Sequence, residues 1–357
     1  MSATWGSKFR ITVFGESHSA AIGVVLDGVP AGVKLDTDAI AAQMARRAPG
    51  TDSLSTPRKE ADIPEIVCGV LDGVTEGTPI AAFIRNANTK SSDYEQLKRL
   101  MRPGHSDYGY FRRYGGFNDV RGGGASSGRL TAALVFAGAV ARQLLAERGI
   151  TVGAHISSLG GVEDARFGTE ISAESLAALG EERIPLLDGS RRDAMRAAVE
   201  EARADGDSVG GTVQCAVVGV KAGMGAPFFE SVESVISSLA FSVPAVKAVA
   251  FGDGFALASM RGSGANDPMY YDGGEVRTRT NRNGGVIGGV TNGMPIVFEV
   301  AIKPTASVFK PQNTVDIKEK KDAVLTLKGR HDPCIVVRAV PVIEAIAAIA
   351  VYDLLGR

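Results

Sequence analysis

Three of the four histidines of this chain lie in short polar segments that contain glycine. His18 belongs to the segment GESHS, His105 to RPGHSD and His331 to GRHDP. Imidazole exchanges protons near neutral pH, and neighbouring carboxylates and guanidinium groups can orient it or bind an anion. These segments therefore predict proton transfer on an anionic ligand. The fourth histidine, His155, stands between apolar residues, and we interpret it as a structural residue of a strand.

A basic, glycine-rich stretch surrounds the second of these histidines. Residues 102–131 carry five arginines, two acidic residues and eight glycines. Glycine-rich backbone that leads into a helix offers N–H groups and the positive end of the helix dipole, and guanidinium groups bind phosphate or carboxylate in pairs of hydrogen bonds. The stretch predicts an anion site, with a solvated basic loop as the alternative. Its glycines match neither the G-x-G-x-x-G nor the P-loop spacing, so no nucleotide fingerprint is present.

Three further segments are weaker signals. The segment from Lys303 to Ser307 follows a strand and presents a cation, hydroxyls and amides, which suit a phosphate or the edge of a flavin ring. The glycine loop 281–289 allows backbone to contact a flat ligand. Asp332 precedes a proline, which holds its backbone extended. Each segment is also typical of an ordinary loop or salt-linked corner, and no spacing of histidines and acids fits a metal site.

The elements that position these residues mix helices with paired strands. His18 lies on a connection between strands, and the aromatic residues of 88–121 indicate an ordered loop. The segment from Thr51 to Pro64 is polar and predicts an exposed loop. Periodicity and capping signals predict strands at 9–14, 22–26, 64–70, 79–85, 210–220, 246–251 and 295–303, and helices at 37–47, 127–147, 172–179, 191–204, 231–241 and from about Pro341 onward. Strand pairs separated by long helices are typical of an α+β fold.

Composition narrows the class of protein. A net charge of −1 and 45% apolar residues argue against nucleic acid or a membrane surface as partner. The three cysteines form no metal or disulfide pattern, and we interpret them as reduced and buried. No signal peptide is evident, and we expect no apolar run to approach the ~20 residues of a membrane helix. The expectation is a cytoplasmic protein with one domain over residues 1–357.

Seven motifs occur in a characteristic order: GESHS, RRAPG, RPGHSDY, RGGGASSGRLTA, GGVIGGVTNG, KPTAS and GRHDPC. Together they resemble the chorismate synthase family over about residues 10–356. The resemblance implies a lyase that converts 5-enolpyruvylshikimate 3-phosphate to chorismate by 1,4-anti elimination of phosphate. It also implies a need for reduced FMN without net redox change, an external flavin reductant, an association with NADP, and a homotetramer of α/β sandwiches in which helices lie between antiparallel sheets.

The resemblance further implies roles for individual residues. His18 and His105 resemble the catalytic histidines, which protonate the departing phosphate and the reduced flavin, and Asp332, assisted by Ser17, resembles the group that relays the substrate proton through flavin N5. Residues that match substrate-binding positions are Arg47, Arg102, Arg129 and Arg330. Residues that match flavin-binding positions are Ala125, Ser126, Ser127, Pro244, Ala245, Gly288, Lys303, Pro304, Thr305, Ala306, Ser307 and Arg330. Ala125 and Ser53 stand where many members have arginine.

Two other classes of function remain as alternatives. A flavin oxidoreductase on an anionic substrate would show net electron turnover and a nicotinamide site, and the sequence has no nicotinamide fingerprint. A non-catalytic module that binds an anion or a flavin would not need both His18 and His105.

Overall fold

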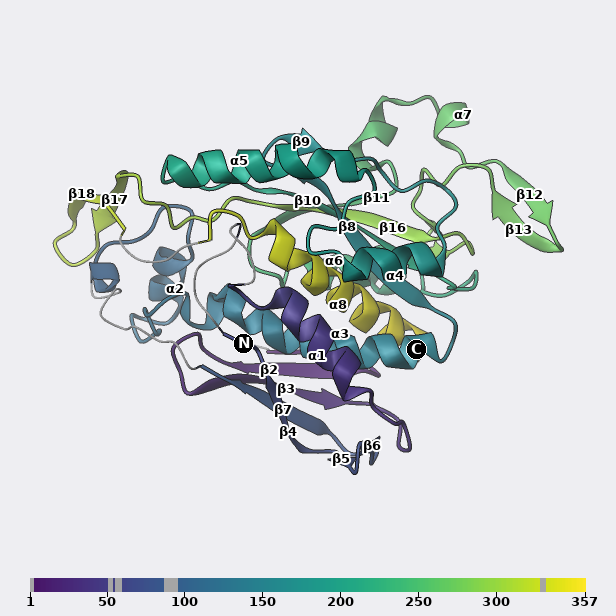
Figure 1. Ribbon diagram of the computed structural model, residues 1–357, viewed down its shortest axis with the longest axis horizontal. Helices are drawn as coiled ribbons and strands as arrows, with labels where there is room; N and C mark the ends of the chain where they lie inside the picture. Colours follow the sequence, from purple (N-terminus) through teal and green to yellow (C-terminus); the bar gives the residue numbers. More distant parts are fainter. Residues whose placement is uncertain (1–2, 51–53, 55–59, 87–95, 328–331) are drawn as a thin grey trace.

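Two five-stranded antiparallel sheets enclose a layer of helices in the computed structural model of this chain (Figure 1). The structure describes residues 3–50, 54, 60–86, 96–327 and 332–357. The first sheet has the strand order β1-β2-β3-β7-β4, and the second has the order β11-β16-β10-β8-β9. The predicted α+β class is confirmed, with helices layered between the sheets.

The first sheet consists of β1 (Thr4–Trp5), β2 (Arg10–Gly15), β3 (Ala21–Asp27), β7 (Ile80–Arg85) and β4 (Pro64–Cys68). The second consists of β11 (Val246–Phe251), β16 (Ile296–Ile302), β10 (Gly211–Val218), β8 (Thr151–Leu159) and β9 (Val162–Glu163). Four short pairs complete the strands: β5 (Val70–Leu71) with β6 (Val74–Thr75), β12 (Met269–Asp272) with β13 (Glu275–Thr278), β14 (Val286–Ile287) with β15 (Val290–Thr291), and β17 (Gln312–Asp316) with β18 (Lys321–Leu325).

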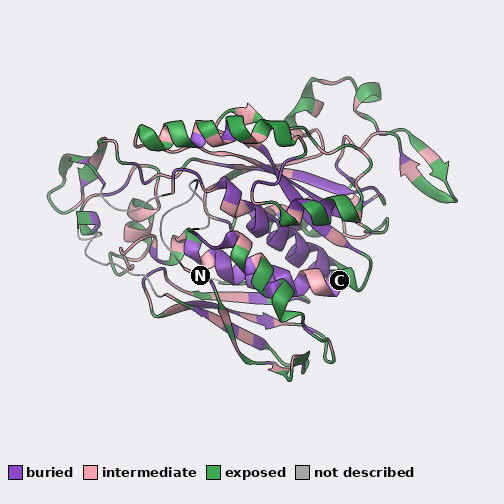
Figure 2. Ribbon diagram, viewed as in Figure 1, coloured by how far each residue is buried: buried purple, intermediate pink, exposed green. Residues whose placement is uncertain are grey.

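The layer between the sheets contains α1 (Thr37–Arg47), α3 (Thr131–Ala146), α6 (Val232–Ala240) and α8 (Val336–Leu355). Figure 2 shows that buried residues concentrate in α3 and α8 and on the strands beside them. A Cβ atom on Gly138 would lie 2.3 Å from the Cβ of Ala345, so glycine lets α3 and α8 approach closely. The remaining helices are α2 (Asp107–Arg113), α4 (Ala173–Glu181), α5 (Arg192–Ala204) and α7 (Gly262–Ala265).

A buried carboxylate joins the helical layer to the second sheet. Glu344 of α8 is fully buried and accepts hydrogen bonds from Arg46 at 2.5 Å, from Arg142 at 2.9 Å and from the backbone N–H of Ala154 at 3.1 Å. Burial opposes ionisation of Glu344, but the two arginines and the amide keep its pKa below the usual value. Removing one partner would leave a buried charge uncompensated, which is far more costly than losing a surface pair.

Several expectations about these elements need correction. The last helix begins at Val336 rather than Pro341, because burial of Val336, Val337 and Val340 stabilises an extra turn before the proline. Of the segment 51–64, residues 51–53 and 55–59 lie outside the described residues; in the remainder Leu54 and Asp62 are each 2% exposed, so these two positions are buried rather than exposed. Cys68 is exposed rather than buried, whereas Cys215 and Cys334 are buried as expected.

One apolar stretch is longer than expected from the sequence. Gly128–Ala146 has 19 residues and a mean hydropathy of 1.3, enough by length and composition to cross a membrane. In the structure, 78% of its most apolar window is buried against the rest of the protein. A core helix passes the same test, and the position of α3 between the two sheets is that of a core helix.

Candidate active site

Loops from four parts of the chain meet near α2 and the first turn of α3 (Figure 1). They are the β2–β3 connection with Ser17 and His18, the segment 102–106 before α2, the turns 122–127 before α3, and the segment 303–307 after β16. Hydrogen bonds between these loops hold them together. The site is therefore made from chain segments that are distant in sequence.

His18 is 6% exposed and is held by the turn before α3. Its Nδ1 lies 3.1 Å from the hydroxyl of Ser17, and that hydroxyl donates to the carbonyl of Arg121 at 3.2 Å. Gly122 has a φ of 64° and lies against the imidazole. A Cβ atom on Gly122 would lie 2.7 Å from Cε1 of His18 and 2.8 Å from the Ser17 hydroxyl, so any larger residue would displace both side chains.

His105 forms a short contact with a carboxylate that also binds an arginine. Its Nδ1 lies 2.6 Å from Oδ1 of Asp107. Arg102 donates to the same carboxylate from Nε and Nη2, each at 2.8 Å, and from its backbone N–H at 3.0 Å. Burial alone raises the pKa of Asp107, but the bonds from Arg102 and His105 outweigh burial and hold that pKa well below the usual range. Asp107 is therefore an ionised acceptor near neutral pH.

Arg102 connects this pair to the His18 side of the site. Its Nη2 donates to the carbonyl of Gly122 at 2.6 Å, and its Nη1 lies 3.4 Å from the hydroxyl of Ser307. A second link joins the hydroxyls of Ser106 and Ser126 at 2.5 Å. We call Ser17, His18, Arg102, His105, Asp107 and Gly122 the histidine cluster. The structure thus brings together His18 and His105, which the sequence singled out separately.

Two of the predicted flavin segments lie side by side at this cluster. The backbone N–H of Lys303 donates to the carbonyl of Ala245 at 3.0 Å, and its Nζ donates to the carbonyl of Gly104 at 3.0 Å. Burial and the nearby Lys247 lower the pKa of Lys303. The Oγ1 of Thr305 is buried without a hydrogen-bond partner among the described residues. A buried hydroxyl with this property fits a site that a ligand completes.

The other predicted flavin positions differ in where they lie. Residues 125–127 are close to these segments, and Gly288 is not. Residues 125–127 lie in the turns before α3 and are tied to the second histidine segment through Ser126. Gly288 lies at the opposite end of β16, because the loop before it packs on Pro295 at the start of that strand. The 7 residues of β16 span about 23 Å, so Gly288 stands apart from Lys303 within one chain.

Two of the predicted substrate arginines form a separate buried group, which we call the arginine cluster (Arg47, Asp62 and Arg129). The Nη1 of Arg47 donates to Asp62 at 2.5 Å, and Arg129 donates to the other oxygen of the same carboxylate. Burial opposes ionisation of Asp62, yet the two arginines lower its pKa. Burial lowers the pKa of Arg47 to about 10 against the opposing effect of Asp62, so Arg47 stays charged at neutral pH.

Asp332 lies between the arginine cluster and the segment 303–307. Its carboxylate accepts from Arg338 Nη1 at 2.9 Å, and Arg338 Nε donates to the carbonyl of Arg47 at 3.0 Å. On the other side, the carbonyl of Pro333 accepts from Val209 at 2.9 Å. The neighbouring Ser208 donates to the carbonyl of Thr305 at 2.8 Å. Arg330, His331 and Ser53 lie outside the described residues.

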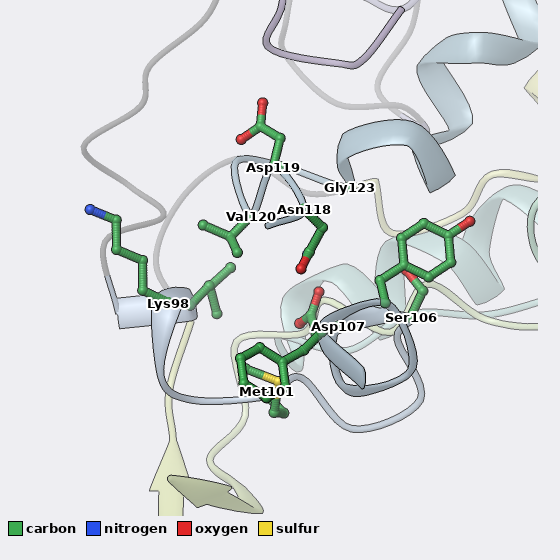
Figure 3. A pocket seen from close by; sticks show the side chains of 12 residues that line it. Lys98, Met101, Ser106, Asp107, Asn118, Asp119, Val120 and Gly123 are labelled. Atoms are coloured by element: carbon green, nitrogen blue, oxygen red, sulfur yellow. The ribbon is translucent and has the colours of Figure 1, made fainter. Parts of the chain in front are cut away.

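A small hollow borders the histidine cluster and is lined by residues of α2 and of the segment 118–123 (Figure 3). Asp107 lines it together with Ser106 and Asn118. Its volume of about 20 Å³ holds roughly one water molecule and no substrate. Among the described residues, no group of three histidines, cysteines or acids has the arrangement of a metal site.

Three residues of the site were not identified from the sequence. Asp107 was part of the second histidine motif but received no role, although its position two residues after His105 could have suggested one. Asp62 lies in a segment that the sequence predicts to be an exposed loop. No residue near it in the sequence indicates that Arg47 and Arg129 bind its carboxylate. Gly122 was one of many glycines, and only the packing of His18 distinguishes it.

Comparison with known proteins gives consistent matches. The family model described as Chorismate synthase matches residues 9–355. The chain is 45% identical to the chorismate synthase of Methanocella arvoryzae over 350 residues, which cover 98% of this chain and 93% of the relative. It is 47% identical to that of Aeropyrum pernix, again over 350 residues, with 98% and 92% covered. A crystal structure of a chorismate synthase superposes with a TM-score of 0.77 at 28% identity and covers 98% of this chain and 92% of that chain.

Proposed function

This chain belongs to the chorismate synthase family, and we propose that its histidine cluster, its arginine cluster and the segment 303–307 form the site of that family's reaction. The enzyme is a carbon–oxygen lyase. It eliminates phosphate from 5-enolpyruvylshikimate 3-phosphate by a 1,4-anti elimination and forms chorismate with no net redox change. The observation that carries the residue assignment is the joining of His18 and His105 through Arg102 and Gly122.

Reduced FMN is the cofactor that we assign to this site. The fit rests on the buried Oγ1 of Thr305, which has no hydrogen-bond partner in the described part of the chain, and on the proximity of Lys303 to Ala245 and Gly104. We propose that Lys303–Ser307, Pro244, Ala245 and the segment Ala125–Ser127 hold it, together with Arg330. When bound, reduced FMN supplies electron density that is returned by the end of the turnover. Gly288 would contact a flavin only in another subunit, since it stands apart in its own chain.

His18 and His105 are the proton donors in this proposal. His18 is held by Ser17 and by the backbone of Gly122, so its ring is fixed in a largely buried position. We assign it to protonation of the departing phosphate. His105 lies beside Gly104, whose carbonyl binds Lys303 of the proposed flavin segment. We therefore assign it to the flavin side of the site, where its doubly protonated ring would donate a proton from Nε2.

Asp332 is the proposed acceptor of the substrate proton, with Ser17 assisting. The carboxylate is oriented by Arg338, which is in turn fixed to the carbonyl of Arg47. The assignment is supported by the position of this carboxylate between the arginine cluster and the segment 303–307.

The substrate carries one phosphate and two carboxylates, which calls for several cations. Arg47, Arg102 and Arg129 are the described members of that set, and Arg330 completes it in our proposal. Each of the three described arginines already binds a carboxylate of its own chain. Arg47 and Arg129 share Asp62, and Arg129 also lies 3.5 Å from the Glu60 carboxylate, so an anionic ligand of these arginines would have to compete with both acids.

The assembly and the surroundings of the enzyme are also part of this proposal. We propose a single-domain chain over residues 1–357 that forms a cytoplasmic homotetramer and receives reduced flavin from an external reductant. In this proposal NADP takes part in the reaction that reduces the flavin, and not in the elimination of phosphate. Exposed aromatic side chains support association between copies, since Phe228 and Phe229 are 84% and 93% exposed and lie next to each other.

An anaerobic assay tests this function. Enzyme, chemically reduced FMN and 5-enolpyruvylshikimate 3-phosphate should release phosphate, with many turnovers for each flavin. His18→Ala and His105→Ala should each lower kcat roughly 100- to 10,000-fold, the usual contribution of a general acid. Arg192→Ala on α5, whose side chain forms an exposed pair with Glu182, is the control and should change kcat by less than about twofold.

The same assay separates the alternatives. A flavin oxidoreductase would consume one reduced flavin for each product. A non-catalytic module would bind flavin, as seen by quenching of flavin fluorescence, without releasing phosphate. Wild-type rates in both histidine variants would exclude the roles assigned to His18 and His105.

A further inference from the structure

We propose that Asp107 is a positioning residue that fixes the tautomer and the ring orientation of His105. Through Arg102, Asp107 also keeps His105 at a fixed position relative to His18. The inference rests on the proposed function for the statement that His105 acts on the reaction. It concerns a carboxylate to which neither the motifs nor the comparisons assign a role. Four contacts on one carboxylate carry it.

The first step concerns the proton on His105. The Asp107 carboxylate is ionised, so its oxygens only accept hydrogen bonds. At 2.6 Å from Oδ1 of Asp107, the Nδ1 of His105 must therefore carry a hydrogen and donate it. The other ring nitrogen, Nε2, remains as the atom that can give or take a proton at the site. A carboxylate that fixes the tautomer of a catalytic histidine in this way is a known means of orienting the ring.

The second step concerns the rigidity of the carboxylate. Asp107 is the first residue of α2, and its carboxylate accepts hydrogen bonds from one backbone and two side-chain N–H groups of Arg102. The side chains of Arg102 and Asp107 are 4% and 12% exposed, so solvent competes weakly for these bonds. The loop between the two residues contains Gly104 and His105. His105 is thus held at both ends of a closed loop.

The third step links the two histidines. Besides Asp107, Arg102 binds the carbonyl of Gly122 at 2.6 Å, and the Cα of Gly122 lies directly against the ring of His18. If Asp107 no longer holds Arg102, the guanidinium can turn and the Gly122 turn loses its bond. A change at Asp107 should therefore affect His105 directly and His18 through two intermediate residues, Arg102 and Gly122.

The experiment uses the full-length chain with ¹⁵N-labelled histidine. The His105 resonances are assigned with His105→Gln, and spectra are recorded at a pH where the rings are neutral. Wild-type His105 should show the Nδ1–H tautomer, and Asp107→Asn should show a mixture of tautomers. In the anaerobic phosphate assay, Asp107→Asn should lower kcat roughly 10- to 100-fold with KM changed by less than about threefold.

The conservative and control variants sharpen the result. Asp107→Glu keeps the negative charge and should recover part of the kcat that Asp107→Asn loses. If circular dichroism shows that Asp107→Asn does not fold, Asp107→Glu replaces it in the tautomer and kcat measurements. Asp164→Asn removes the carboxylate from the other histidine–aspartate pair and should leave the His105 resonances and kcat unchanged.

Two results would overturn the inference: the Nε2–H tautomer in wild-type His105, or wild-type kcat and tautomer in folded Asp107→Asn. If the wild-type chain releases no phosphate, the proposed function fails. The tautomer measurement still decides whether Asp107 controls the ring, so the two failures can be told apart.

Discussion

Two histidine–aspartate pairs in this molecule have nearly the same contact and different surroundings. In the histidine cluster, Nδ1 of His105 lies 2.6 Å from Asp107, and the two side chains are 21% and 12% exposed. In the second sheet, Nδ1 of His155 lies 3.0 Å from Asp164, and both side chains are 0% exposed. The pair alone therefore does not indicate catalysis.

The other partners of each aspartate make the difference. Asp164 accepts the backbone N–H groups of Leu187 and Asp188 at 2.7 and 2.9 Å, so it anchors a chain segment beside β8. Asp107 instead binds the guanidinium of Arg102, which leads to a second histidine. Moreover, Nε2 of His155 lies 3.2 Å from Gln214, so neither ring nitrogen is open to a ligand. One pair stabilises the fold, and the other presents a ring nitrogen.

Glycine-to-alanine changes beside the two histidines should separate these roles most strongly. In Gly122→Ala, the new methyl group would overlap His18 and Ser17 and shift both, so we expect kcat to fall roughly 100-fold because displacements of about 1 Å are that costly in a site. The measurement is anaerobic phosphate release per folded molecule.

Gly153→Ala is the matched change in the strand that carries His155. Its methyl group would lie 2.8 Å from the Cβ of Leu176 on α4, so it should lower the free energy of unfolding by about 1–3 kcal/mol without lowering kcat. A loss of kcat in Gly153→Ala equal to that in Gly122→Ala would remove the distinction between the two regions.

The sequence allowed the helices to be predicted, and it singled out His18 and His105, because these signals are local. Asp36 caps α1 by accepting from Ala39, and Pro49-Gly50 follows its end, so the predicted boundaries 37–47 were confirmed. His18 and His105 stood out because histidine is scarce and both lie in polar turns. Such signals depend on residues a few positions apart.

The features that escaped prediction depend on contacts distant in sequence. Asp62 is buried because Arg47 and Arg129, which lie 15 and 67 positions away, share its carboxylate. The partner of Gly122 is His18, on another loop. The apolar spacing of the last residues predicts a helix from about Pro341, but burial of Val336, Val337 and Val340 stabilises a start at Val336. Whether Gly288 joins the flavin site stays a prediction about assembly.

Asp164→Asn should affect stability and leave the chemistry intact. The amide keeps one acceptor oxygen, but one of the three groups now served by the carboxylate loses its partner or faces an N–H donor. The free energy of unfolding should therefore fall by about 1–3 kcal/mol, measured by urea denaturation. The kcat of the folded fraction should stay at the wild-type value. A fall in kcat without a fall in stability would mean that the second pair also serves the site.

The smallest expected effect is a pH dependence of stability from His155. Burial lowers the pKa of His155 below its ordinary value of 6.5, because the effect of burial outweighs the opposing effects of Gln214 and Asp164. Above pH 6.5 the ring is neutral in both folded and unfolded chains. As the pH falls below that value, the unfolded chain takes up a proton that the folded chain resists, so stability is lost, by at most about 1.4 kcal/mol per pH unit. Urea denaturation between pH 7.5 and pH 5 should therefore show a shallower slope for His155→Gln than for the wild type. Equal slopes would mean that Asp164 keeps His155 charged in the fold, and the two histidine–aspartate pairs would then differ only in exposure.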